Sequence, residues 1–135
     1  MAQMTTFSFG TRVPGTVADL QPRVEAALQA EGFGVLTQID VQATLAAKLG
    51  VERQPYVILG ACNPALAHRA IEADPSVGAL LPCNVVLRAD GDTTIVEAMD
   101  PMAALGLVDE PAMRSIATEA RDRLARVIAS LEVPS

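Results

Sequence analysis

The sequence predicts an α+β fold in which helices pack on a largely antiparallel sheet. Two patterns alternate along the chain: short β-prone runs bounded by turn residues, and longer stretches whose apolar residues recur at helical spacing. The turn Asp90-Gly91-Asp92 joins two β-prone runs and favours an antiparallel hairpin. The expected element order is β-α-β-(short α)-β-α-β-β-α, and we expect the 135 residues to form one domain.

Cap and breaker residues set the boundaries of these elements. Ser, Thr, Asn and Asp before an apolar run are typical helix caps, whereas Gly and Pro end helices or mark turns. Thr16 and Asn63 are such caps, and Pro22 should bend the first helix. The expected elements are strands over residues 5–9, 33–41, 55–61, 81–89 and 93–98, helices over residues 16–32, 42–49, 63–74 and 111–131, turns over residues 10–15 and 90–92, and an apolar connection over residues 102–108.

Composition and charge argue against several classes of partner. The net charge is −6, Lys48 is the only lysine, and no basic run is present, so we expect neither nucleic acid nor an anionic membrane surface as a partner. No uncharged apolar stretch approaches the ~20 residues that a membrane helix needs, and residues 1–9 do not resemble a signal peptide. We therefore expect a soluble, cytoplasmic protein whose two cysteines are reduced.

Both cysteines lie at junctions between predicted elements. Cys62 comes directly before the helix cap Asn63, and Cys83 follows Pro82 near the start of a strand. We expect the two strands to bring the thiols near each other. A thiol before a helix cap faces the positive end of the helix dipole, where free N–H groups can stabilise a thiolate. Free cysteines are equally common as small buried hydrophobic residues, so both interpretations stay open.

Three kinds of site could use these thiols. With His68, the only histidine, they make a candidate three-ligand set for zinc, and a thiolate pair would equally suit copper(I) or iron. A thiol-redox function needs the two Cα atoms within about 7 Å, although no CxxC motif is present. A small ligand is the other alternative. Its candidate binding residues are Tyr56, Cys62, Asn63, Cys83 and Asn84.

Several motifs resemble a known prokaryotic family. They are Gly60-Ala61-Cys62-Asn63-Pro64, Leu80-Leu81-Pro82-Cys83-Asn84-Val85, Gly32-Phe33 followed by Ile39-Asp40-Val41, Gly50-Val51 before Pro55-Tyr56, and Asp100-Pro101. Over roughly residues 5–130 the chain is similar to the family called domain of unknown function 302, or DUF302. The resemblance implies a TBP-like α+β fold, a curved antiparallel sheet with helices on one face, often as a homodimer. It implies no established catalytic activity.

The family motifs carry over to specific positions of this chain, which are Cys62, Asn63, Pro64, Pro82, Cys83 and Asn84. His68 falls at a variable position of the pattern, and Pro22 departs from it. No Ser/His/Asp arrangement and no phosphate-binding glycine motif is present, so the residues define no reaction. We expect a small-ligand or metal site between the two cysteine junctions. The alternatives are a homodimeric interaction module whose junctions serve only packing, and a thiol-redox protein.

Overall fold

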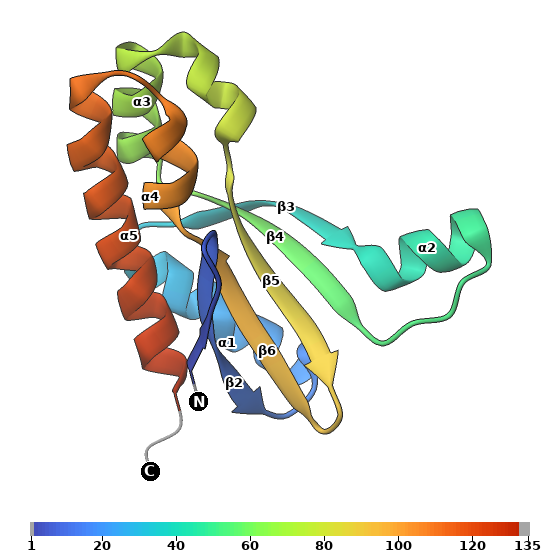
Figure 1. Cartoon of the computed structure of the whole chain (residues 1–135). Helices are drawn as coiled ribbons and strands as arrows, with labels where there is room; N and C mark the ends of the chain where they lie inside the picture. The colour runs from blue at the N-terminus through green and yellow to red at the C-terminus, as the bar shows by residue number, and fades with distance from the viewer. Residues whose placement is uncertain (1, 133–135) are drawn as a thin grey trace.

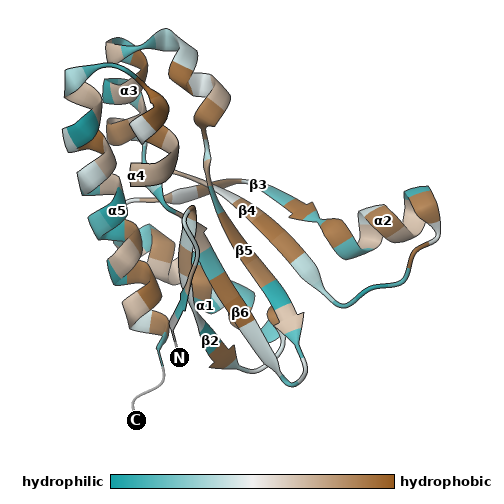
Figure 2. Ribbon diagram, in the orientation of Figure 1, coloured by the Kyte–Doolittle hydropathy of each residue, from teal (hydrophilic) through white to brown (hydrophobic). Residues whose placement is uncertain are grey.

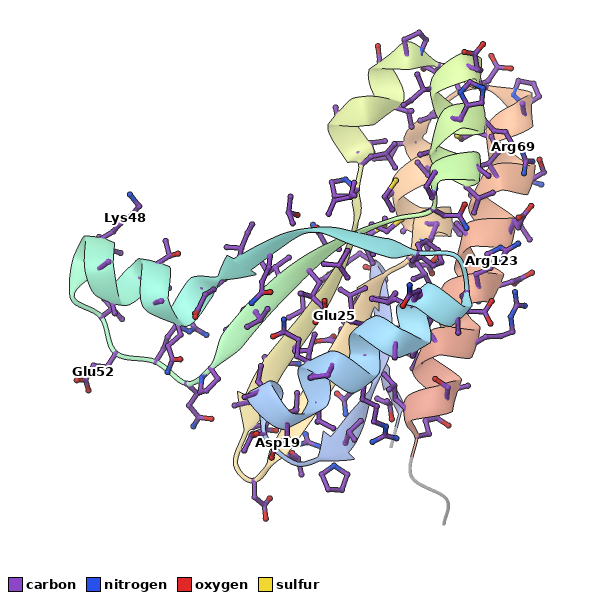
Figure 3. All side chains as sticks on the ribbon, turned by 180° about the vertical axis from the view of Figure 1, so that it is seen from behind. Asp19, Glu25, Lys48, Glu52, Arg69 and Arg123 are labelled. Carbon is purple, nitrogen blue, oxygen red and sulfur yellow. The ribbon has the colours of Figure 1, made fainter. Side chains whose placement is uncertain are left out.

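Six strands form one antiparallel sheet in the computed structural model, which describes residues 2–132. The strands are β1 (Ala2–Met4), β2 (Ser8–Pro14), β3 (Gly34–Asp40), β4 (Tyr56–Cys62), β5 (Cys83–Asp90) and β6 (Thr93–Met99), in the spatial order β1-β2-β6-β5-β4-β3. Helices α1 (Val17–Ala30) and α5 (Pro111–Leu131) cover one face of this sheet (Figures 1 and 3). The predicted α+β fold is confirmed.

The two faces of the sheet differ in chemistry because side chains alternate along each strand. Leu59 on β4 and Leu87 on β5 point toward the helices and are fully buried in the main hydrophobic cluster. The opposite face carries charged pairs, including Arg12 with Asp90 at 2.7 Å and Arg88 with Glu97. This face therefore combines charged pairs with apolar residues such as Ile58, Val86 and Ile95. The main apolar core lies between the sheet and the two long helices.

A second hydrophobic cluster lies beyond one end of the sheet. It is built by α3 (Pro64–Ala73), the 3-10 helix η1 (Pro75–Leu80), η2 (Leu105–Leu107) and the first half of α5, and α4 (Pro101–Ala104) packs against α5 beside it. Helix α5 joins the two clusters, since Ala120 belongs to the second and Leu124 to the first. The seam between the clusters separates the sheet from α3.

Local signals placed most helix ends correctly. The Thr16 hydroxyl accepts a hydrogen bond from the Asp19 N–H at 3.1 Å, which caps α1, and α1 continues through Pro22. Helix α2 (Val41–Leu49) ends at Gly50, whose φ of 66° is readily adopted only by glycine. The apolar connection expected over residues 102–108 contains α4 and η2.

The predicted boundaries of the N-terminal strand, residues 5–9, and of the turn after it are wrong. Residues 5–7 connect β1 to β2, and the segment expected to turn, residues 10–15, is strand as far as Pro14. Gly10 marks a close approach rather than a turn, because a Cβ there would collide with the backbone of β6 at Val96 and Glu97. Gly10 is therefore needed for the close pairing of β2 with β6, and the neighbouring residues in the sequence do not reveal this role.

Strand β3, helix α2 and the loop after it form an arm, defined here as residues 34–55, whose outer part projects from the body (Figures 1 and 2). Helix α2 contains no buried residue, although Figure 2 shows it rich in hydrophobic positions. Leu49 at its end is 70% exposed. No helix within residues 2–132 is both long enough and apolar enough to cross a membrane.

Candidate functional site: a cavity at the cysteine junctions

A cavity of about 290 Å³ lies at the seam between the two hydrophobic clusters. Half of its fourteen lining residues are Ala, Gly or Cys, whose side chains are too small to fill the space between α3 and the strand ends. The lining residues are Phe33, Leu36, Ala61, Cys62, Asn63, Leu66, Ala67, Ala70, Ile71, Gly78, Leu81, Pro82, Cys83 and Ala120. Three of the sequence motifs therefore meet at one cavity: the two cysteine motifs and Gly32-Phe33.

The two cysteines reach this cavity from neighbouring strands. Ala61 on β4 is paired with Cys83 on β5, so Cys62 is one residue beyond the partner of Cys83. Both thiols are free; Cys62 is half-buried, whereas Cys83 is only 7% exposed. The expectation that the strands bring the thiols near each other is met, since both residues line the same cavity.

Burial keeps the Cys83 thiol protonated. Loss of hydration is the main cause, and the nearby Cys62 adds to it; together they raise the pKa of Cys83 from 9.0 to about 11. At neutral pH the Cys83 side chain is therefore an uncharged thiol. With no metal bound, it forms part of an apolar wall, and a protonated thiol is a weak nucleophile.

Asn63 has a structural task at the edge of the cavity. Its side-chain Oδ1 accepts a hydrogen bond from the Leu66 N–H at 3.2 Å and caps α3, as the Asn-Pro pair predicted. Its amide nitrogen lies against Gly32, where any Cβ would be 2.9 Å from that nitrogen. Gly32 also has a φ of 83°, so the loop before Phe33 fits closely onto the start of α3.

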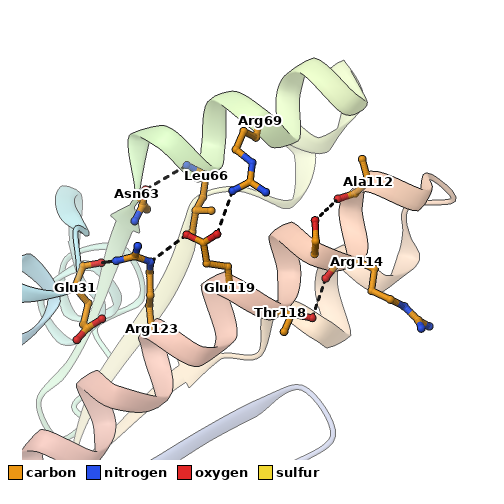
Figure 4. A network of polar contacts seen from close by, with 10 residues as sticks. Glu31, Asn63, Leu66, Arg69, Ala112, Arg114, Thr118, Glu119 and Arg123 are labelled. Atoms are coloured by element: carbon orange, nitrogen blue, oxygen red, sulfur yellow. Dashed lines mark hydrogen bonds and ion pairs between the residues drawn. The ribbon is translucent and has the colours of Figure 1, made fainter.

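A network of charged side chains holds α3 and the end of α1 against α5 (Figure 4). The Glu119 carboxylate accepts hydrogen bonds from Arg69 at 3.1 Å and from Arg123 at 3.3 Å. Arg123 also donates to the Glu31 carbonyl at the end of α1, at 3.1 Å. The hydrogen bond from Arg69 is the main reason that the pKa of Glu119 lies below its ordinary value. These contacts fix the elements around the cavity without entering it.

The structure does not bring the three candidate metal-binding residues together. His68 is exposed and lies in a separate hollow beside Arg69 and Glu72, not with the two thiols. Two residues along a helix rotate a side chain by about 200°, so His68 faces away from the side on which Leu66 is buried. Within residues 2–132, no group of three His, Cys, Asp or Glu side chains comes together as a metal site.

Two of the candidate ligand-binding residues lie outside the cavity. Tyr56 is six residues before Cys62 on β4, roughly 20 Å along the strand, and its ring lies under the Arg53 guanidinium at 5.2 Å. Asn84 is exposed, because it follows Cys83 and so points to the opposite face of the sheet.

The remaining wall residues were missed as site residues. Phe33 and Ala120 are buried cavity residues from distant parts of the chain. The Gly32-Phe33 motif was a signal for Phe33, whereas Ala120 is one of many apolar positions on α5 and nothing local marks it. Gly60 leaves no free space beside β4, since a Cβ there would collide with the Thr37 side chain and lie 2.9 Å from Pro82 Cγ. A further hollow, of about 470 Å³ beside α4 and η2, contains none of the cysteine-motif residues.

Comparisons with known proteins identify relatives of this chain. Residues 9–131 match the family described as "Domain of unknown function DUF302". A crystal structure of an uncharacterized conserved protein DUF302 from Bacillus stearothermophilus is 32% identical in sequence and superposes with a TM-score of 0.87. That alignment covers 95% of this chain and 100% of the other chain. No curated protein matches the sequence. The family resemblance read from the motifs is confirmed.

Proposed function

Because the chain belongs to the DUF302 family, whose description assigns no activity, we propose from its own geometry that it binds a small apolar ligand between the two cysteine junctions. The observation that carries the proposal is the cavity of about 290 Å³, in which both thiols and three sequence motifs meet. Small-molecule sites are typically concave and mostly apolar, with volumes from about 300 Å³ upward. The cavity has that character and lies at the lower end of that size range.

The chemistry of the walls supports a binding role over metal or redox chemistry. A zinc site in a protein uses at least three side-chain ligands, and within residues 2–132 the two thiols have no third His, Cys, Asp or Glu side chain beside them. Reversible disulfide chemistry requires an attacking thiolate, and burial disfavours that form of Cys83. A reducing compartment such as the cytoplasm keeps both thiols free, as the proposal requires.

Binding of a small apolar probe tests the proposal. Benzene occupies apolar protein cavities of about 150 Å³, so it fits this one. Isothermal titration calorimetry should detect benzene binding to the wild-type protein but not to the cavity-filling variant Ala67→Leu. Ala65→Leu is the matched control, because Ala65 lies on the same helix, is exposed and does not line the cavity. Equal heats for the three proteins, or no binding to the wild type, would contradict the proposal.

The arm favours a second function, self-association into a homodimer. Helix α2 has nine residues, whereas isolated helices shorter than about 12–15 residues are marginal in water, so packing against a partner should stabilise it. Strand β3 is at the sheet edge and has no Lys or Pro of the kind that commonly protects edge strands. Beyond the cavity, the arm carries exposed apolar side chains, which are Ile39, Leu49 and Val51.

Charge supports a second copy as the partner of the arm. Two acidic and two basic residues, Asp40, Glu52, Lys48 and Arg53, leave residues 34–55 with no net charge in a chain of net charge −6. Figure 3 shows Lys48 and Glu52 near the tip of the arm. Two arms can therefore approach each other with less repulsion than other parts of the two chains.

Sedimentation equilibrium tests the homodimer. The wild type should have twice the chain mass of 14.1 kDa, and Leu49→Lys should shift it toward the monomer. Leu107→Lys is the matched control, because Leu107 is 77% exposed but lies in η2, away from the arm. A dimer that dissociates with Leu107→Lys and survives Leu49→Lys would exclude the arm as the interface.

A further inference from the structure

Within residues 2–132, the walls of the cavity carry no charged side chain. Apart from the two thiols, Asn63 supplies the only polar side chain among the described residues that line it. The Asn63 Oδ1 is already engaged by the Leu66 N–H. A charged group inside would lose its hydration and gain no counter-charge, which is strongly unfavourable. The part of a ligand that enters is therefore uncharged and apolar.

Exposure distinguishes the floor of the cavity from its mouth. Phe33, Ala61 and Ala120 are almost completely buried and form the floor. Leu36 and Ile71 also line the cavity, yet they are 67% and 44% exposed. The mouth thus lies between β3 and α3, and a polar group of the ligand can remain there in water.

Helix α3 sets the length of the cavity. Its lining side chains run from Leu66 to Ile71, a span of about 7.5 Å at 1.5 Å per residue. An extended alkyl chain advances about 1.25 Å per carbon atom, so about six carbons match this span. The volume of about 290 Å³ sets the upper limit, since about 30 Å³ per water-sized group allows about ten such groups.

We propose that the cavity binds a straight aliphatic chain of about six to ten carbon atoms. The methyl end lies at the floor beside Ala61 and Cys83, and the polar end stays in water between Leu36 and Ile71. This inference rests on the proposed ligand-binding function, because it names the class of ligand that the same cavity takes.

A series of straight-chain alcohols tests the length and the orientation. By isothermal titration calorimetry, affinity should rise about fourfold for each methylene from butan-1-ol to octan-1-ol, and stop rising by dodecan-1-ol. Octane-1,8-diol should bind at least about tenfold more weakly than octan-1-ol, because its inner hydroxyl would be buried without a partner. Octanoate should bind within a few fold of octan-1-ol, since its charged end stays at the mouth.

Variants and outcomes separate this inference from the proposed function. Ala67→Leu should abolish octan-1-ol binding and Ala65→Leu should retain it. Benzene binding without a length dependence among the alcohols, or equal affinity for octan-1-ol and the diol, would overturn the aliphatic chain and leave a binding cavity. If neither benzene nor octan-1-ol binds, the proposed function fails as well.

Discussion

Filling the cavity should make the free protein more stable. The change is Ala67→Leu on α3, at a half-buried position whose side chain lines the cavity. Leucine adds three carbon atoms to alanine, and each buried methylene-sized group contributes about 0.8 kcal/mol. Because the position is half-buried, we expect the free energy of unfolding to rise by about 1–2 kcal/mol.

Urea denaturation followed by circular dichroism measures this change, with Ala65→Leu as the control. Both variants replace Ala by Leu within α3, so any difference in helix propensity is shared and cancels in the comparison. Ala65 is exposed, and its replacement should leave stability almost unchanged.

The result that would refute this reasoning is a loss of stability in Ala67→Leu relative to Ala65→Leu. Inserting carbon atoms into a space that is already filled typically costs about 1–3 kcal/mol. Destabilisation on that scale would mean that the seam is closed in solution, and the proposed site would not exist. A gain in stability together with loss of benzene binding would support both the presence of the cavity in solution and its ability to bind a ligand.

Three further outcomes follow from the contacts around the cavity. The raised pKa of Cys83 stabilises the fold below about pH 9, and the free energy of unfolding should fall by up to about 3 kcal/mol between about pH 9 and 11; Cys83→Ala should flatten this slope in urea titrations, and an unchanged slope would contradict the burial of the thiol. The pKa of Glu119, followed by NMR, should rise when Arg69→Ala removes its main hydrogen-bond donor, and a constant pKa would argue against that contact in solution. Asn63→Ala should lower the free energy of unfolding by about 1 kcal/mol through loss of the α3 cap, whereas Asn63→Ser should retain most of it; equal losses would indicate that capping is not what Asn63 contributes.

Local sequence was sufficient for the elements and for much of their order. Helix caps and glycine stops act through nearby backbone groups, so Thr16, Asn63 and Gly50 could be interpreted without knowledge of the fold. The Asp90-Gly91-Asp92 hairpin and the two cysteine junctions were found for the same reason. The N-terminal error arose because Gly10 responds to the neighbouring strand β6 and not to its own neighbours in the chain.

By itself, then, the sequence determined the α+β class, most helix ends and the adjacency of Cys62 and Cys83, because these depend on local hydrogen bonds and on strand order. Only the tertiary structure decided which side chains share a cavity. His68 faces away from the cavity because of its position around helix α3, and Asn84 points to the other face of the sheet because side chains alternate along a strand. The cavity itself is a shortage of side-chain volume between α3 and the strand ends, and such a shortage depends on packing across the whole fold.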